Sequence, residues 1–116
     1  MENSVDVDRA WEALKISVLA HDPEVSEGKM MTADALTSGG KVFVFRSRRN
    51  GHGLGCKLGK GATPADLGVD GWRPLQPWKG KAPMGGWFVI DVAEEGNWSR
   101  IAEAALTRVR EEQADA

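Results

Sequence analysis

The residues with the most reactive side chains gather between positions 46 and 61, where a cysteine, a histidine, glycines and basic residues lie close together. Cys56 and His52 are four residues apart, but a nucleophilic cysteine also needs a third group that orients its base. Cys56 lies two residues from both Leu54 and Leu58, so the three side chains would share one side of a strand. This pattern predicts a buried and inert thiol. Two widely spaced histidines and one cysteine form no metal-ligand pattern. We therefore expect no catalytic residue, no metal site and no cofactor.

The glycine-rich segment 51–61 invites a phosphate-binding interpretation, which its spacing contradicts. A P-loop ending at Gly59-Lys60 needs glycine where Leu54 stands and serine or threonine where Gly61 stands. A dinucleotide-binding fingerprint needs a further glycine where Leu58 stands, and the βαβ context is missing for both motifs. We expect these glycines to make turns and to narrow one face of a sheet.

Basic residues concentrate in the middle of the sequence. Residues 29–81 hold ten Lys and Arg against three acidic residues, residues 1–28 hold two against seven, and residues 82–116 hold three against seven. Either acidic helices neutralise a basic sheet within one fold, or the middle segment is a basic patch for an acidic partner. An exposed hairpin tip could place guanidinium groups on phosphates. The candidate nucleic-acid-binding residues are Arg46, Arg48, Arg49, Lys57 and Lys60.

Two further sets of residues are candidates for binding. Trp72, Trp78 and Trp87 could line a small-ligand pocket between a loop and the sheet, although aromatic residues more often belong to the core. Ile16 and Leu19 lie off the apolar stripe of the first predicted helix. They are either covered by the following loop or face a partner, which makes them the candidate self-association residues.

Apolar residues at helical spacing predict one helix near each end of the chain. The first begins at the cap Ser4 and ends at His21-Asp22-Pro23, because the residue before proline avoids the helical region. Its apolar stripe is Val7, Trp11, Leu14 and Val18. Asn97 caps the last helix, whose predicted buried stripe is Trp98, Ile101, Ala102, Ala105, Leu106 and Val109.

Two runs that are apolar on both faces, at positions 42–45 and 87–90, predict interior strands. An Asn-Gly pair joins the first run to a strand at 54–58 as a hairpin. Residues 29–36 form a weaker strand. We expect Trp87 to be buried against Trp98 or Trp11 of the helices.

The remaining segments are predicted as connections. Residues 25–28 read as loop, Thr63 caps a short helix at 64–67, and residues 71–81 read as irregular because they contain two prolines. The predicted fold class is a two-layer α+β domain, in which N-terminal and C-terminal helices pack on an antiparallel sheet of four to five strands.

Length and composition restrict the kind of protein. A chain of 116 residues fits a single domain, here 1–116. No apolar run approaches the length of a membrane span, and the acidic N-terminus does not resemble a secretory signal. A lone cysteine agrees with a reducing compartment, so we expect the cytoplasm.

The order of features from residue 27 to residue 110 resembles the bacterial TfoX N-terminal domain and the related YjbR (MmcQ-like) proteins. Similar segments are Glu27-Gly28-Lys29-Met30-Met31, Gly40-Lys41-Val42-Phe43-Val44, Gly71-Trp72-Arg73-Pro74-Leu75 and Pro83-Met84-Gly85-Gly86-Trp87-Phe88-Val89-Ile90, which resembles the family's Pro-Met-x-x-Trp-x-x-Val strand. The resemblance implies an antiparallel sheet flanked by helices, similar to the fold of type III secretion chaperones. It implies no catalytic residue, and members of the family are linked to regulation of DNA uptake.

These observations favour a small non-enzymatic binding domain that acts on a protein partner or on its own copy. A nucleic-acid-binding or competence-type regulatory module that uses the basic hairpin at 41–60 is the first alternative. A protein that holds a small ligand in a pocket is the second.

Overall fold

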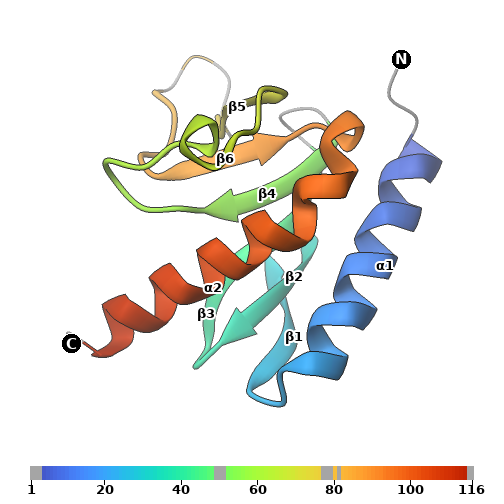
Figure 1. The fold of residues 1–116 in the computed structure, drawn as a ribbon, viewed down its shortest axis with the longest axis vertical. Coiled ribbons are helices and arrows are strands. Elements are labelled where there is room, and N and C mark those ends of the chain that lie inside the picture. Colours follow the sequence, from blue (N-terminus) through green and yellow to red (C-terminus); the bar gives the residue numbers. More distant parts are fainter. Residues whose placement is uncertain (1–3, 49–51, 77–79, 81, 115–116) are drawn as a thin grey trace.

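A six-stranded antiparallel sheet organises the computed structural model, which describes residues 4–48, 52–76, 80 and 82–114 (Figure 1). Its strands are β1 (Val25–Met30), β2 (Ala33–Ser38), β3 (Lys41–Ser47), β4 (Gly53–Lys57), β5 (Trp72–Pro74) and β6 (Trp87–Ile90). They lie side by side in the order β1-β2-β3-β4-β6-β5, and each neighbouring pair is antiparallel. The predicted α+β class is confirmed, with one strand more than the upper expectation.

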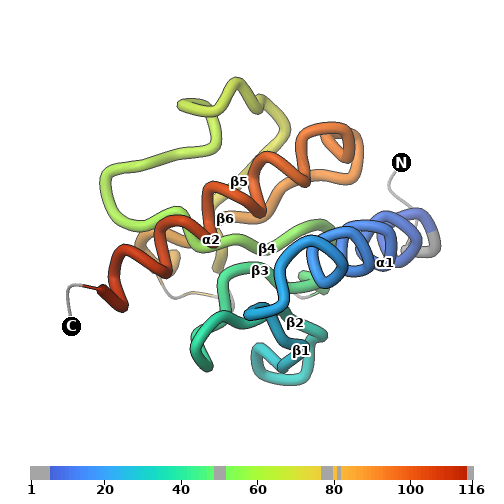
Figure 2. The backbone as a smooth tube through the Cα atoms, turned by 60° about the horizontal axis from the view of Figure 1, so that its bottom comes forward, coloured from blue at the N-terminus to red at the C-terminus, as the bar shows by residue number. Residues whose placement is uncertain are grey.

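Two long helices, α1 (Ser4–His21) and α2 (Trp98–Ala114), cover the same face of this sheet (Figure 2). Short 3₁₀ helices lie at Pro64–Leu67 (η1) and Val92–Asn97 (η2). Thr63 is the N-cap residue of η1 as predicted, and its backbone N–H donates to the side chain of Asp66. Within the described residues, no helix combines the length and the apolar character that a membrane crossing requires.

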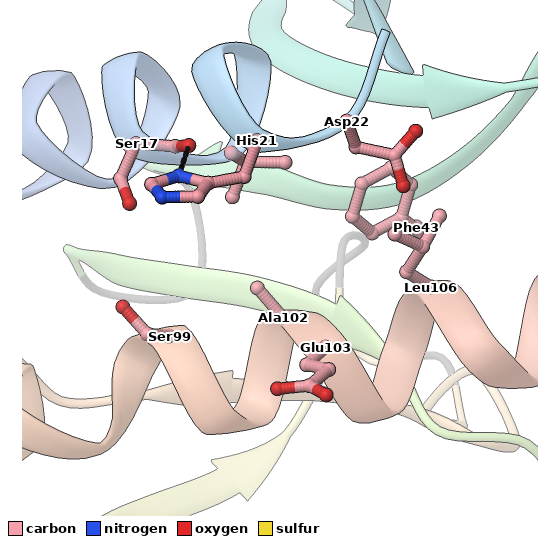
Figure 3. Close-up of a pocket in the computed structure, with 9 residues that line it drawn as sticks. Ser17, His21, Asp22, Phe43, Ser99, Ala102, Glu103 and Leu106 are labelled. Atoms are coloured by element: carbon pink, nitrogen blue, oxygen red, sulfur yellow. Dashed lines mark hydrogen bonds between the residues drawn. The ribbon is translucent and has the colours of Figure 1, made fainter. Parts of the chain in front are cut away.

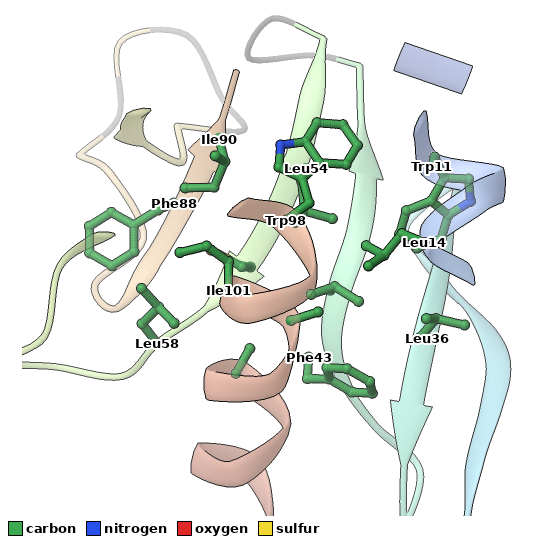
Figure 4. Packing of buried hydrophobic residues seen from close by; sticks show 14 of the residues in the cluster. Trp11, Leu14, Leu36, Phe43, Leu54, Leu58, Phe88, Ile90, Trp98 and Ile101 are labelled. Carbon is green, nitrogen blue, oxygen red and sulfur yellow. The ribbon is translucent and has the colours of Figure 1, made fainter. Parts of the chain in front are cut away.

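The main core lies between the helices and the sheet, and both predicted helical stripes reach it. Figure 4 shows Trp11 and Leu14 of α1 and Trp98 and Ile101 of α2 directed toward side chains of the strands. The stripe of α1 is buried at its first three positions and half-buried at Val18. The α2 stripe is buried at five residues and half-buried at Leu106.

A β-bulge explains the continuous apolar run of β3. The register pairs Leu36 with Val44 but Thr37 with Val42, which leaves Phe43 as an extra residue on β3. Phe43 and Val44 therefore both belong to the core beneath the helices, where both are fully buried. The interior position of this strand, predicted from the run, is confirmed.

The opposite face of the sheet carries a smaller apolar cluster around Phe45 and Val89. Trp87 joins this cluster, with its ring centroid 5.9 Å from that of Phe45, and it is only half-buried. The expectation that Trp87 packs on the helix tryptophans is therefore wrong, because alternation along β6 turns Phe88 toward the helices and Trp87 away from them. Gly55 lies directly under the Phe45 ring, where a Cβ would come within 2.2 Å of a ring atom.

The two edge strands differ most from the sequence-based expectation. The predicted loop at 25–28 and weak strand at 29–36 are in fact a hairpin of β1 and β2 joined by Met31-Thr32, with Met31 at φ 57°. Three of the six residues of β1, Ser26, Glu27 and Lys29, are polar and exposed, so no apolar run marks this strand. β5 occupies the other edge, where Pro74 is tolerated.

Candidate interaction surface

The outer face of α1 carries apolar residues beside the exposed charged residues Arg9 and Glu12. Trp11 and Leu14 point into the core, whereas Ile16 lies on the other side of the helix with 65% of its surface exposed. Ala13 and Ala20 precede and follow Ile16 by three and four residues and are also exposed. Residues at this spacing lie on the same side of a helix. We call Ala13, Ile16 and Ala20 the α1 outer face.

The two residues predicted for self-association have different surroundings. Ile16 is open to solvent, whereas Leu19 is half-buried and packs against the main core. Leu19 therefore lies at the margin of the α1 outer face. The two alanines were not among the predicted residues, although their spacing from Ile16 was a signal present in the sequence.

A groove of about 300 Å³ separates α1 from α2 (Figure 3). Fully buried Phe43 lies beneath it, and the rim carries hydroxyl groups, a histidine and carboxylates. The groove is lined by Ser17, Val18, His21 and Asp22 of α1 and the residue after it, by Phe43 of β3, and by Ser99, Ala102, Glu103 and Leu106 of α2. Sequence reasoning did not find this groove, because its residues come from three distant segments.

The polar groups at the groove are mainly hydrogen-bond acceptors. His21 Nδ1 donates to the Ser17 carbonyl oxygen at 2.7 Å, so Nε2 of the neutral ring is left to accept. Asp22 receives two hydrogen bonds from Arg110, at 2.8 and 3.0 Å. These bonds hold the pKa of Asp22 below its usual value. Glu103 is exposed on α2 and adds a carboxylate to the rim.

Arg46 and Arg48 of the basic hairpin are not exposed together. Arg46 is completely buried. Its Nε donates to Asp8 of α1 at 2.8 Å, and its Nη1 lies 3.0 Å from His52 Nδ1. Nη1 also donates to the Ser47 carbonyl oxygen at 2.5 Å. The expectation that Arg46 is exposed for phosphate contact is wrong, because β3 turns this side chain under the N-terminal half of α1.

Other basic residues of the middle segment also contact acidic groups. Arg48 is 54% exposed and lies 3.6 Å from Asp8. Lys57 of β4 bridges to Glu112 of α2 at 3.0 Å, and this contact lowers the pKa of Glu112. Lys60 is exposed, and the predicted Arg49 lies outside the described residues. These pairs support the interpretation that acidic helices neutralise a basic sheet.

The predicted tryptophan pocket is divided by the sheet. Trp72 contacts Phe88 edge-to-face at 5.4 Å on the helix side, whereas Trp87 lies on the opposite side. These two residues therefore line no common pocket, and Trp78 lies outside the described residues. Cys56 is completely buried as predicted, and burial raises the pKa of its thiol to about 12. Across the described ranges, no three His, Cys, Asp or Glu side chains form a metal-binding group.

Comparison of the chain with protein-family models, curated proteins and solved structures gave no match. The resemblance to the TfoX N-terminal domain and the YjbR-like proteins therefore stays a prediction that rests on short sequence motifs.

Proposed function

We propose that the chain is a small, non-enzymatic cytoplasmic domain that acts by binding its own copy through the α1 outer face. The observation that carries this proposal is Ile16, a large apolar side chain with 65% of its surface exposed. Helix α2 differs because its exposed residues that turn away from the sheet, such as Glu103, Thr107 and Arg108, include no large apolar side chain over the described length of the helix. Exposed apolar surface of this kind favours contact with another protein surface.

The shape of the α1 outer face suits a second copy of itself. Ile16 projects between two alanines, whose side chains are short. It can therefore pack into the shallow depression beside an alanine of the facing helix. In a two-fold interface each contact occurs twice. Complete burial of both isoleucines would contribute about 3–6 kcal/mol, from about 1.5–3 kcal/mol for each side chain. Association costs at least about 4 kcal/mol, so Ile16 alone supports only weak self-association.

The first prediction concerns this surface. Ile16→Glu should weaken self-association at least about tenfold, because each copy then brings a carboxylate to the apolar contact. Sedimentation equilibrium over micromolar to millimolar concentrations measures the effect. Thr107→Glu is the matched control, since it adds the same charge to an exposed position of α2. A wild-type chain that stays monomeric throughout this range contradicts the proposed function.

The groove between α1 and α2 supports a second candidate function, the binding of a small organic ammonium ion. Val18 and Leu106, both half-buried, offer apolar surface to a hydrocarbon stem, while the Glu103 carboxylate and His21 Nε2 can accept from the ammonium group. Among the described residues, the groove lining includes no lysine or arginine. Its volume of about 300 Å³ matches the lower end of ligand pockets.

The second prediction tests the groove with a defined probe. Pentylammonium should shift the backbone amide resonances of Ala102 and Glu103 in a saturable manner, whereas the uncharged 1-pentanol should bind several-fold more weakly. Glu103→Gln removes the charge and keeps the shape, so it should reduce pentylammonium binding about tenfold. Equal binding of the two probes, or no effect of Glu103→Gln, would remove this candidate.

A further inference from the structure

Strand β1 leaves one side of its backbone open at the end of the sheet. It is six residues long and pairs with β2 alone in the described sheet. A two-residue turn joins Met30 to Ala33, so these two residues form the closing hydrogen-bonded pair of the hairpin. Because ladder bonds alternate in direction, Gly28 also bonds inward, and the backbone groups of Glu27 and Lys29 point outward.

We propose that two copies of the chain join through this edge, with β1 antiparallel to the partner's β1 and the two-fold axis at Gly28. The inference rests on the proposed self-association and specifies its geometry. The two sheets would then form one continuous sheet across the interface. An open strand edge is a template for such pairing.

The charges on β1 select the register. With the axis at Gly28, Glu27 of each copy lies opposite Lys29 of the other, and both residues have outward-pointing backbone groups. Glu27 already pairs with Lys15 and Lys29 with Asp34 of β2, but both side chains are 64% exposed, so both can also reach across the interface. Opposite charges that face each other across an antiparallel pair stabilise it.

Other registers bring like charges together. Outward-pointing residues must pair with outward-pointing residues, so the axis moves in steps of one residue, to Glu27 or to Lys29. An axis at Glu27 places the two copies of Glu27 opposite each other, and an axis at Lys29 does the same for Lys29. Both arrangements are unfavourable, so Gly28 is the position that the charges favour.

The α1 outer face lies next to the same edge. Helix α1 runs over the side of the sheet that ends in β1 (Figures 1 and 2). Lys15 of α1 bridges to Glu27 of β1 at 3.2 Å, which fixes the helix beside the strand. Pairing of the two β1 strands would therefore bring the two α1 helices near each other through the side that carries Lys15 and Leu19, with Ile16 at the edge of the contact. The backbone hydrogen bonds between the two β1 strands would add the stabilisation of the dimer that Ile16 alone does not provide.

The third prediction is a charge exchange across the interface. Glu27→Lys alone places lysine opposite Lys29, and Lys29→Glu alone places glutamate opposite Glu27, so each should weaken the dimer about tenfold or more. The double variant restores opposite charges and should regain most of the lost affinity. Sedimentation measures the affinities, and thermal unfolding checks that each variant is folded. Equal weakening by the double variant and the singles overturns the proposed register.

Amide hydrogen exchange separates this inference from the proposed function. In the dimer the outward N–H groups of Glu27 and Lys29 bond across the interface, so their exchange should slow at least about tenfold as protein concentration rises. The Gly28 amide, which already bonds to β2, is the internal control and should change less. Dimers with unprotected Glu27 and Lys29 amides overturn the β1 pairing and leave the α1 contact standing. A monomeric wild-type chain overturns both.

Discussion

Arg46→Ala should lower the free energy of unfolding by about 3–5 kcal/mol, a large part of the stability of a domain this size. The Arg46 side chain is completely buried and joins β3 to α1 through Asp8. Its removal leaves a cavity and takes a hydrogen-bond donor from the carbonyl oxygen of buried Ser47. Chemical denaturation followed by circular dichroism measures the loss.

Arg48→Ala is the matched control for this change. Arg48 carries the same charge, lies two residues along the chain and is 54% exposed, so its loss should cost less than about 0.5 kcal/mol. Asp8→Asn should have an intermediate effect, because asparagine still accepts a hydrogen bond while the buried guanidinium loses its counter-charge. Equal stability of the Arg46→Ala and Arg48→Ala variants would show that Arg46 is not a structural residue.

The position of Arg46 shows why the hairpin could not be interpreted from its sequence. The pattern located β3 and β4 and predicted a turn between them. It did not predict that α1, more than thirty residues earlier, supplies an acidic partner, Asp8, beside the strand. The local sequence indicates on which side of its strand a side chain lies. Tertiary packing decides which helix or loop covers that side. Arg46 is therefore buried and Arg48 is exposed, although both contact Asp8.

Amphipathic helices and doubly buried strands were predictable, and edge strands were not. Helix α1 and the interior strands β3 and β6 have apolar patterns because their neighbours cover them. β1 is covered on fewer sides, so residues such as Glu27 and Lys29 give it the composition of a loop. The apolar run of β3 also concealed a bulge, which only the pairing with β2 reveals.

The candidate surface was predictable in part. Ile16 is apolar and lies off the helical stripe, and this was sufficient to select it. Leu19 satisfied the same criterion, but it packs at the margin of the core because the buried side of α1 is wider than the predicted apolar stripe. The groove beside α1 joins Ser17, Phe43 and Glu103, residues whose proximity follows only from the fold.

Trp98→Ala should also lower the free energy of unfolding by about 3–5 kcal/mol. Trp98 begins α2, is 1% exposed and belongs to the main core (Figure 4). Its Nε1 donates to the Asp91 carbonyl oxygen at 3.1 Å, which fixes the chain leaving β6 to the start of the helix. Trp87→Ala is the control and should cost less, because Trp87 is half-buried on the other face of the sheet.

The indole N–H contribution can be separated from packing by comparing Trp98→Phe with Trp11→Phe. Both tryptophans are almost completely buried, but Trp11 Nε1 has no hydrogen-bond partner among the described residues. Both changes remove a similar volume, and only Trp98→Phe also breaks a hydrogen bond, which leaves the Asp91 carbonyl oxygen with the Glu94 N–H as its donor. Trp98→Phe should therefore destabilise the domain by about 1 kcal/mol more than Trp11→Phe. Equal losses in denaturant unfolding would show that packing, and not this hydrogen bond, fixes the start of α2.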